Sequence, residues 1–396
     1  MTISNSRNGH SLHLAYFSPE SFGGLADYAR EQAQALSAAG ARVSFITSPS
    51  VAKVQQNAQY KLVPILAEVP SRSESRNRWS RRLRSMSWIV GNMRRLAEWV
   101  EREQVKCVLL GAYMEYFAPL WAPQFLRLAQ KGVVFGSVVH DPLRNFIVGP
   151  LWWHRWSTAC GYSFLREAFI HEPIDLPTVR PQPQLCTTVI PHGPFRFPAA
   201  TESRSAVRQR LRIPEPAQLL LAFGHIRDVK NLDLLLEAMV QRPEFYLLVA
   251  GREQGASQRP AAFYQQRAAA LGIADRCRWE TRHIPELEVG NYFEASDLMA
   301  LTYGTGFRSA SGVLNAAVHF RKPCLASSGL SNLRTMIEKY ALGFWVEPDS
   351  ALAIADGLQR WLRERPAADW KRYAEDNSWK RNAELVLGRF SPEWQS

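Results

Sequence analysis

The sequence has few of the features that mark secreted, membrane-spanning or metal-bound proteins. No run approaches the ~20 apolar residues of a membrane-spanning helix, and the opening MTISNSRNGHSLHLAYF lacks the charged, apolar and small-residue order of a secretory signal. The cysteines, at positions 107, 160, 186, 277 and 324, include no CxxC pair, which indicates neither a disulfide framework nor a zinc site. We therefore expect a cytoplasmic protein without a metal centre.

Acidic residues are outnumbered by basic ones. The 36 acidic and 48 basic residues give a net charge of +12, which favours an anionic partner such as nucleotide phosphates, an anionic membrane or nucleic acid. Eight arginines and one acid lie between Arg72 and Arg95, interleaved with apolar residues. This segment predicts a basic amphipathic surface that either binds the inner face of the cell membrane or is a solvated helix face. No nucleic-acid partner is expected, because no recognised binding motif accompanies the charge.

The first half of the chain predicts a Rossmann-like domain. An apolar strand at 11–17 leads to two glycines and a helix over 25–40, and further strands are expected at 41–47, 106–111, 132–140, 165–173 and 186–193. Strands that alternate with helices in this way form a parallel sheet.

The second half repeats this plan. Strands are expected at 218–224, 245–251, 276–280, 296–303 and 322–327, with helices over 231–241, 260–271 and 311–320. Proline and polar residues interrupt the apolar pattern at 194–205. We therefore predict an α/β protein with Rossmann-like domains over 1–200 and 201–375 and a helical tail over 376–396.

Three loops offer groups that could bind a ligand at the carboxyl ends of these strands. Gly23 and Gly24 precede a helix, so their N–H groups could receive a phosphate or sugar oxygen, or simply form a turn. Arg227 and Lys230 follow the strand at 218–224 and could neutralise a departing diphosphate, unless their loop is only solvated. His140 ends the strand at 132–140, where it could touch a substrate or serve as structure.

Small residues at the start of GTGFRSASGVLNAAV (304–318) precede the predicted helix over 311–320. Ser309 or Ser311 is the expected N-cap, which would leave the amides of Gly312, Val313 and Leu314 free to hold a phosphate. Simple capping of the helix is the alternative.

The sequence resembles the retaining GT-B glycosyltransferases of family 4 (glycosyl transferases group 1) over nearly its whole length. AYFSPESFGGLADYAREQAQALSAAGARV resembles their opening strand, glycine loop and helix, VVHDP their histidine-bearing strand end, and VIPHG their interdomain approach. FGHIRDVKNLDLLLEA resembles their phosphate-binding turn, and LLVAG, ASDLMAL, SGVLNAA and KPCLAS follow in family order. NSWKRNAELVL resembles the closing helix that crosses back to the first domain.

The resemblance implies the GT-B fold, in which two Rossmann-like domains face each other across a cleft. The N-terminal domain would lie on the acceptor side, and the C-terminal domain would bind a nucleotide sugar. Arg227, Lys230, Ser311, Gly312 and Val313 would hold the donor diphosphate. His140 would contact the donor sugar near the reacting carbon, Ser309 and Asn315 the sugar or ribose, and Gly23 and Gly24 would border the acceptor and phosphate.

The implied reaction moves a hexose-type sugar from a nucleotide diphosphate to a glycan or lipid-linked acceptor in polysaccharide or glycoconjugate biosynthesis. The configuration at the anomeric carbon would be retained, the leaving diphosphate would assist deprotonation of the acceptor, and neither a metal nor a cofactor would be needed.

One departure from the family pattern weakens this reading. The family carries two glutamates separated by seven residues where this chain has Phe307 and Asn315. Asparagine can still hydrogen-bond a ribose hydroxyl, but phenylalanine cannot replace a carboxylate beside the sugar. The alternative is a catalytically weak or inactive GT-B module that binds a glycan or a partner protein. Retention of Arg227, Lys230 and His140 favours the enzyme.

Overall fold

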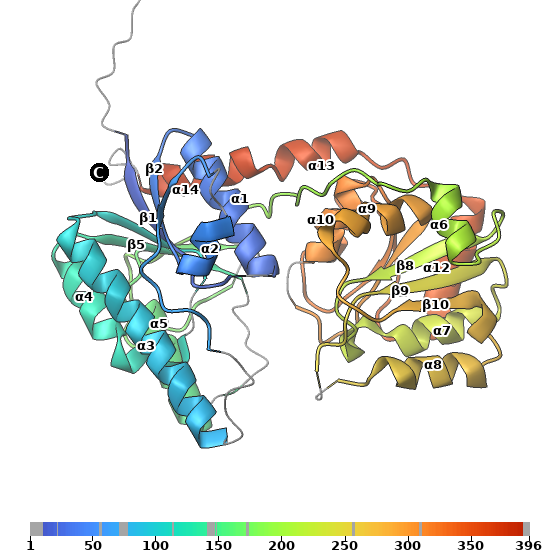
Figure 1. Ribbon diagram of the computed structural model, residues 1–396, viewed down its shortest axis with the longest axis horizontal. Coiled ribbons are helices and arrows are strands. Elements are labelled where there is room, and N and C mark those ends of the chain that lie inside the picture. The colour runs from blue at the N-terminus through green and yellow to red at the C-terminus, as the bar shows by residue number, and fades with distance from the viewer. Residues whose placement is uncertain are drawn as a thin grey trace, which may run out of the picture. The chain divides into compact units, whose positions relative to one another are not determined.

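The computed structural model describes two compact units. The described residues are 11–21, 23–54, 58–70, 78–112, 115–140, 147, 149–171, 174–255, 258–308 and 311–390, with backbone alone at 54 and 78–81. The first unit comprises Met1–Pro191 with Trp379–Ser396, and the second comprises His192–Ser378. Each is a parallel sheet covered by helices (Figure 1).

The first unit contains a seven-stranded sheet in the order β3-β2-β1-β4-β5-β6-β7. All paired strands run parallel, and β1 and β4 lie near the centre, as in doubly wound folds. The strands are β1 (His13–Phe17), β2 (Arg42–Ile46), β3 (Lys61–Val63), β4 (Cys107–Leu110), β5 (Val134–Val139), β6 (Glu167–Ile170) and β7 (Cys186–Val189).

Helices cover both faces of this sheet. α1 (Gly24–Ala38) and α14 (Trp379–Phe390) share one apolar cluster, whereas α3 (Arg78–Arg102), α4 (Ala122–Gln130) and α5 (Leu151–Tyr162) contribute to another. The short helices α2 (Pro49–Val54) and η2 (Glu115–Leu120) complete the unit. In α14 the buried residues Ala383, Val386 and Phe390 recur at helical spacing, which is why this last helix packs on α1 of the first unit.

The second unit has a six-stranded parallel sheet in the order β10-β9-β8-β11-β12-β13. Its strands are β8 (Gln218–Phe223), β9 (Phe245–Ala250), β10 (Cys277–Glu280), β11 (Leu298–Thr302), β12 (Cys324–Ser327) and β13 (Gly343–Trp345). Its helices are α6 (Arg204–Arg210), η3 (Asp228–Lys230), α7 (Leu232–Val240), α8 (Ala261–Ala270), η4 (Ala274–Arg276), α9 (Glu286–Ala295), α10 (Gly312–His319), α11 (Leu333–Lys339), α12 (Ala351–Arg363) and α13 (Trp370–Asp376).

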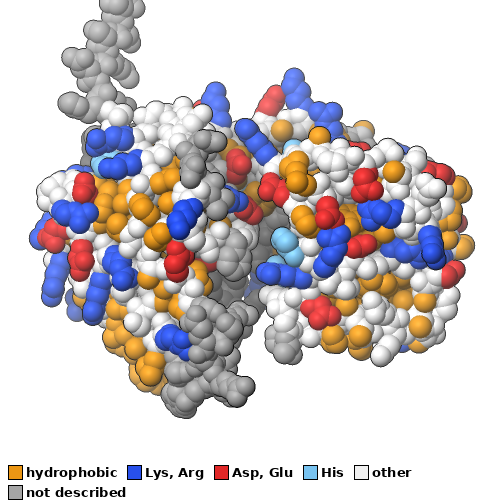
Figure 2. All heavy atoms as spheres, in the orientation of Figure 1, with side chains coloured by type: hydrophobic (Ala, Val, Ile, Leu, Met, Phe, Trp, Pro, Cys, Tyr) orange, Lys and Arg blue, Asp and Glu red, His pale blue; other side chains and the backbone are white. Residues whose placement is uncertain are grey.

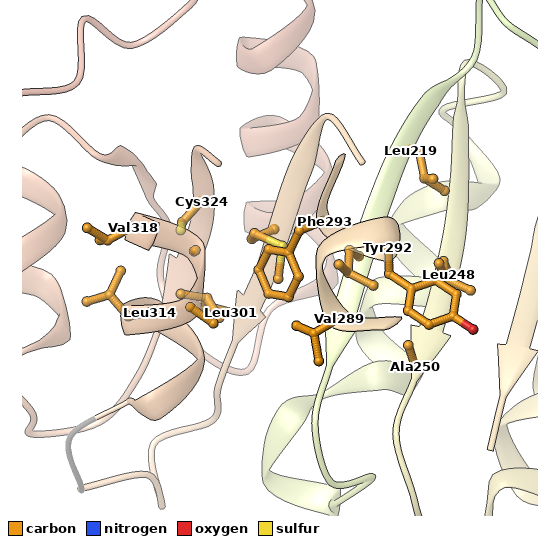
Figure 3. Close-up of a cluster of buried hydrophobic side chains, with 14 of the residues drawn as sticks. Leu219, Leu248, Ala250, Val289, Tyr292, Phe293, Leu301, Leu314, Val318 and Cys324 are labelled. Atoms are coloured by element: carbon orange, nitrogen blue, oxygen red, sulfur yellow. The ribbon is translucent and has the colours of Figure 1, made fainter. Parts of the chain in front are cut away.

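One core of the second unit fixes the strands and the helix that lead to the candidate site. Figure 3 shows Phe293 of α9 and Leu314 of α10 among side chains from the strands, including Leu219 of β8 and Leu301 of β11. These side chains are almost completely buried. Burial of each such leucine or phenylalanine contributes about 1.5–3 kcal/mol, so the ends of β8 and α10 are held firmly.

The predicted fold class is confirmed, since both halves are Rossmann-like parallel sheets. The named strands and helices are all present, while the short edge strands β3 and β13 were not anticipated. The units divide at Pro191, earlier than the expected boundary near residue 200. The physical reason is that Phe197 packs against the core of the second unit.

The basic segment from Arg72 to Arg95 is only partly a surface. Residues 71–77 lie outside the described chain, and α3 begins at Arg78. Within α3, Ile89 and Met93 are buried in the core, whereas Arg82, Arg94 and Arg95 are exposed. Among the described residues, no helix combines the length and the apolar character that crossing a bilayer requires.

Candidate active site

The loop after β8 carries the two predicted phosphate-binding cations. Gly224 turns the chain with a positive φ of 84°, a conformation open to glycine without strain. The helix η3 then brings Nζ of Lys230 back to donate to the carbonyl oxygen of Phe223 at 2.5 Å. Burial, reinforced by the charge of Arg227, lowers the pKa of Lys230 to about 7. An anion bound at this loop would oppose that shift, because it favours the charged ammonium.

The charge of Arg227 also affects the pKa of two neighbouring side chains. The pKa of His225 is lowered by burial and by the charges of Arg227 and Arg252. His225 remains an acceptor, since its Nε2 receives a hydrogen bond from Nε of Arg252 at 3.0 Å. Burial raises the pKa of Tyr303, and the charge of Arg227 opposes that rise. Arg227 thus lies among groups from the ends of β8, β9 and β11.

The N-terminus of α10 lies beside this loop. Oγ of Ser311 accepts a hydrogen bond from the Leu314 N–H at 3.2 Å, so Ser311 is the N-cap. A Cβ placed on Gly224 would lie 3.6 Å from Nζ of Lys230 and 3.6 Å from Cγ2 of Val313. The cationic loop and the start of α10 therefore meet at one place.

The expectation that the Leu314 amide is free is wrong, because Ser311 accepts its hydrogen. The amides of Gly312 and Val313 belong to the first turn, where an α-helix supplies no internal acceptor. Together with the positive end of the helix dipole they suit an anion. Ser309 lies outside the described residues.

Asn315 is buried inside the second unit. Its Nδ2 lies 2.9 Å from Nδ1 of His192, and its Oδ1 accepts a hydrogen bond from the Tyr373 hydroxyl at 3.0 Å. Burial lowers the pKa of His192 to about 4, so the imidazole is neutral. A ribose hydroxyl would have to displace one of these partners. These contacts join Asn315 to two other segments of the second unit, and its contact with the sugar or ribose stays a prediction.

Phe307, one of the two positions where the sequence departs from the pattern it resembles, packs against an aromatic neighbour. Its ring stacks on Tyr303 with centroids 4.1 Å apart and an interplanar angle of 21°. The Tyr303 hydroxyl in turn lies 3.0 Å from Oγ of Ser311. The side chain at position 307 is therefore an apolar ring packed on Tyr303, not a carboxylate.

A carboxylate that the sequence patterns did not reveal braces the loops of the second unit. Oδ2 of Asp349 accepts hydrogen bonds from the N–H and the hydroxyl of Thr305 at 2.9 and 2.7 Å, and Oδ1 accepts from Nδ2 of Asn231 at 2.8 Å. Hydrogen bonds from Thr305 and Asn231 outweigh burial and lower the pKa of Asp349. No local motif could have indicated this contact, because Asp349 and Asn231 are 118 residues apart.

Gly23 and Gly24 lie in the first unit, at the start of α1. Gly23 is the N-cap residue with φ of 86°, and its carbonyl oxygen accepts a hydrogen bond from the Asp27 N–H at 3.0 Å. A Cβ on either glycine would meet nothing within 4 Å, so there is space beside this turn. Half-buried Glu20 lies just before it, and burial raises the pKa of its carboxyl group.

His140 follows β5 and is held by contacts within the first unit. Its Nε2 lies 3.0 Å from the carbonyl oxygen of Gly111, and its ring meets Tyr28 edge to face with centroids 4.5 Å apart. His171, at the end of β6, lies 5.5 Å away between ring centroids. An imidazole that donates from Nε2 presents Nδ1 as an acceptor. The sequence indicated His140 but neither Tyr28 nor His171, because Tyr28 comes near through the packing of α1 on the sheet and His171 through the pairing of β5 with β6.

Within the described residues, no group of three or more His, Cys, Asp or Glu side chains is placed to hold a metal ion. The expectation of a metal-free site stays a prediction.

The comparisons with known proteins agree with this architecture. Residues 203–383 match the family model of glycosyl transferases group 1. A D-inositol 3-phosphate glycosyltransferase of Geodermatophilus obscurus is 28% identical over 217 residues, which cover 52% of this chain and 47% of that protein. Its counterpart in Xylanimonas cellulosilytica is 27% identical over 198 residues, which cover 48% and 46%. The chain thus spans about half the length of the curated relatives it matches.

Solved structures resemble nearly the whole chain. A glycosyltransferase from Rickettsia africae is 15% identical with a TM-score of 0.61, and the match covers 97% of this chain and 96% of that one. Anabaena Alr3699/HepE in complex with UDP is 13% identical with a TM-score of 0.67, and the match covers 98% and 100%. At sequence identities this low, the similarity shows the fold alone. Residues 203–383 therefore match the model of glycosyl transferases group 1, and the chain has the GT-B fold of solved glycosyltransferases.

Proposed function

We propose that the chain is a glycosyltransferase that moves a hexose-type sugar from a nucleotide diphosphate to a glycan or lipid-linked acceptor in polysaccharide or glycoconjugate biosynthesis. The observation that carries the proposal is the meeting of Lys230 and Val313 beside Gly224, each 3.6 Å from a Cβ placed there. A cation and a helix N-terminus at one place suit a pyrophosphate. Solved neighbours in complex with UDP and with UDP-glucose support a nucleotide sugar as the donor.

Lys230 and Arg227 would stabilise the diphosphate as it leaves. The negative charge on that group grows as the bond to the sugar breaks, and preorganised cations in a poorly hydrated loop are most effective against such charge. Because the pKa of Lys230 is about 7 in the unliganded loop, the bound phosphates would raise it and keep the ammonium charged. Ser311, Gly312 and Val313 would hold the same group from the N-terminus of α10.

The first unit would supply the groups around the sugar and the acceptor. His140, oriented by Gly111 and Tyr28, would accept a hydrogen bond from a sugar hydroxyl near the reacting carbon. Gly23 and Gly24 would border the acceptor. In the retaining scheme the acceptor oxygen bonds to the anomeric carbon as the bond to the diphosphate breaks, and a phosphate oxygen takes the acceptor proton. No metal or cofactor takes part.

A catalytically weak or inactive GT-B module remains the second candidate. The stacking of Phe307 on Tyr303 favours it, because an apolar ring occupies the position of the family's first acid. Such a module would bind a glycan or a partner protein without transferring sugar.

Calorimetry with UDP, GDP and ADP tests the proposal. The wild-type protein should bind one of them, Lys230→Ala should bind it more weakly, and Lys371→Ala, which removes an exposed lysine from α13, should bind it as the wild type does. Failure of the wild type to bind any of the three would reject the donor site and leave the non-catalytic module.

A further inference from the structure

Two strongly exposed tryptophans lie on one face of α5. Trp152 is 66% exposed and Trp156 is 45% exposed, and Leu151 beside them is 48% exposed. Arg155 is exposed on the same face, because residues separated by three or four positions are neighbours on a helix. The C-terminal half of α5 is buried, at Ser157, Thr158, Ala159, Gly161 and Tyr162. A cluster of large aromatic side chains exposed to solvent indicates an interaction surface.

The N-terminal end of α3 lies at the same edge of the first unit. The buried residues Ile89 of α3 and Tyr162 of α5 belong to one cluster, so both helices cover the same face of the sheet. Each helix precedes a parallel strand, so its N-terminal end lies toward the carboxyl edge of the sheet. α3 has 25 residues and measures about 37 Å, against about 13 Å for the four residues of β4. The start of α3 therefore projects beyond that edge.

The charge on these two helix ends has one sign. α5 contains no acidic residue, and α3 has none before Glu98. Arg82 is exposed, and Leu83 beside it is 59% exposed. Figure 2 shows hydrophobic side chains gathered at the lower edge of the first unit, in the part of the molecule that α3 and α5 occupy in Figure 1. Tryptophan, leucine and arginine exposed at one edge of the unit match the headgroup region of an anionic bilayer.

We propose that Arg82, Leu83, Leu151, Trp152, Arg155 and Trp156, the α3–α5 surface, dock the protein on an anionic lipid bilayer. The tryptophans enter the headgroup region, and the arginines meet lipid phosphates. His140 lies at the same carboxyl edge of the sheet, because it follows β5. This surface also bears on the acceptor. If the proposed function holds, we infer that the acceptor is lipid-linked and is presented from that bilayer.

Vesicle flotation tests the docking surface. The full chain is mixed with vesicles of phosphatidylcholine alone or of phosphatidylcholine and phosphatidylglycerol in equal parts. We expect the wild type to float with the anionic vesicles, the double variant Trp152→Ser and Trp156→Ser to lose at least about tenfold in vesicle affinity, and Arg155→Glu to lose affinity as well. The matched controls are Leu287→Ser with Leu352→Ser, which removes residues 64% and 72% exposed in the second unit, and Arg363→Glu in α12.

Equal flotation of the double tryptophan variant and its control would overturn the proposal, as would equal binding to neutral and anionic vesicles. A wild type that binds no vesicles would also overturn it. In that case, loss of dimerisation in the tryptophan variant would assign the surface to a second copy of the chain, and loss of oligosaccharide binding would assign it to a glycan. Nucleotide binding is measured on the same preparations. A wild type that floats as expected and binds no nucleotide would support the surface and reject the proposed function.

Discussion

The side-chain amide of Asn315 lies 2.9 Å from Nδ1 of His192, although 123 residues separate them. His192 is the first residue of the second unit, and Asn315 belongs to α10, whose N-terminus we assign to the donor diphosphate. Asn315 also accepts a hydrogen bond from Tyr373 of α13, the last helix before the chain returns to the first unit. One buried amide therefore joins α10 to both segments that lead into and out of the second unit.

Replacing that amide with an apolar side chain should destabilise the protein. Asn315→Leu removes the contact with the His192 imidazole and takes the acceptor from the buried Tyr373 hydroxyl, which costs about 1–3 kcal/mol. Denaturant unfolding measures the loss, and Gln266→Leu on the exposed side of α8 is the control. A variant as stable as its control would show that the Asn315 contacts contribute nothing.

The neutral state of His192 makes stability depend on pH. Its pKa is about 4 in the folded protein and about 6.5 in an unfolded chain, so the unfolded state binds more protons between these values. The free energy of unfolding is therefore unaffected by the protonation of His192 above pH ~6.5. It decreases as the pH falls toward ~4, by at most about 3 kcal/mol. Melting temperatures recorded from pH 7 to pH 4 should fall less steeply for His192→Gln than for the wild type. Exposed His283→Gln should follow the wild type, and parallel curves for all three proteins would contradict the assignment.

Loss of the Lys230 side chain should slow sugar transfer more than it weakens the fold. Lys230→Ala removes one preorganised donor at the place where charge develops, which is expected to lower kcat by about 100-fold. Turnover of the nucleotide sugar that the binding screen identifies measures the effect, and circular dichroism checks that the fold is intact. Unchanged turnover would mean that the donor diphosphate lies elsewhere.

Affinity for the nucleotide diphosphate should fall as the pH rises above 7. The unliganded Lys230 has a pKa of about 7 and must take up a proton to pair with the phosphates, which becomes harder at higher pH. The dissociation constant of the wild type should rise by up to about tenfold per pH unit above pH 7. Calorimetry on Lys230→Met supplies the reference, whose profile should be nearly flat. Equal slopes for the two proteins would count against proton uptake by this lysine.

A methyl group at Gly251 should disrupt the donor loop. A Cβ there would lie 2.2 Å from the carbonyl oxygen of Gly224, so Gly251→Ala must displace the turn that positions Lys230. Gly255→Ala is the matched control, because its φ of 140° is also positive and its Cβ would meet nothing within 4 Å. We expect Gly251→Ala to lose nucleotide binding in calorimetry while the control keeps most of it. Similar losses in both variants would point to backbone strain alone.

Periodicity alone predicted both Rossmann-like sheets. Strand-length apolar runs such as 218–224 alternate with helical patterns such as 231–241, and this order leaves few other folds. The sequence also identified Arg227, Lys230 and His140 as candidates, because the carboxyl ends of parallel strands are where such sheets bind ligands.

Long-range packing decided what these residues and their neighbours contact. No local pattern connects Asn315 with His192, or Asp349 with Asn231, because each pair is more than 100 residues apart. Phe307 and Tyr303 are close in sequence, but the stacking of their rings was not predicted. Composition likewise singled out the arginines from Arg72 to Arg95, but only the packing of α5 left Trp152 and Trp156 in solvent. The order of strands and helices follows from the local preferences of the residues. The burial or exposure of a side chain depends on how those elements pack together.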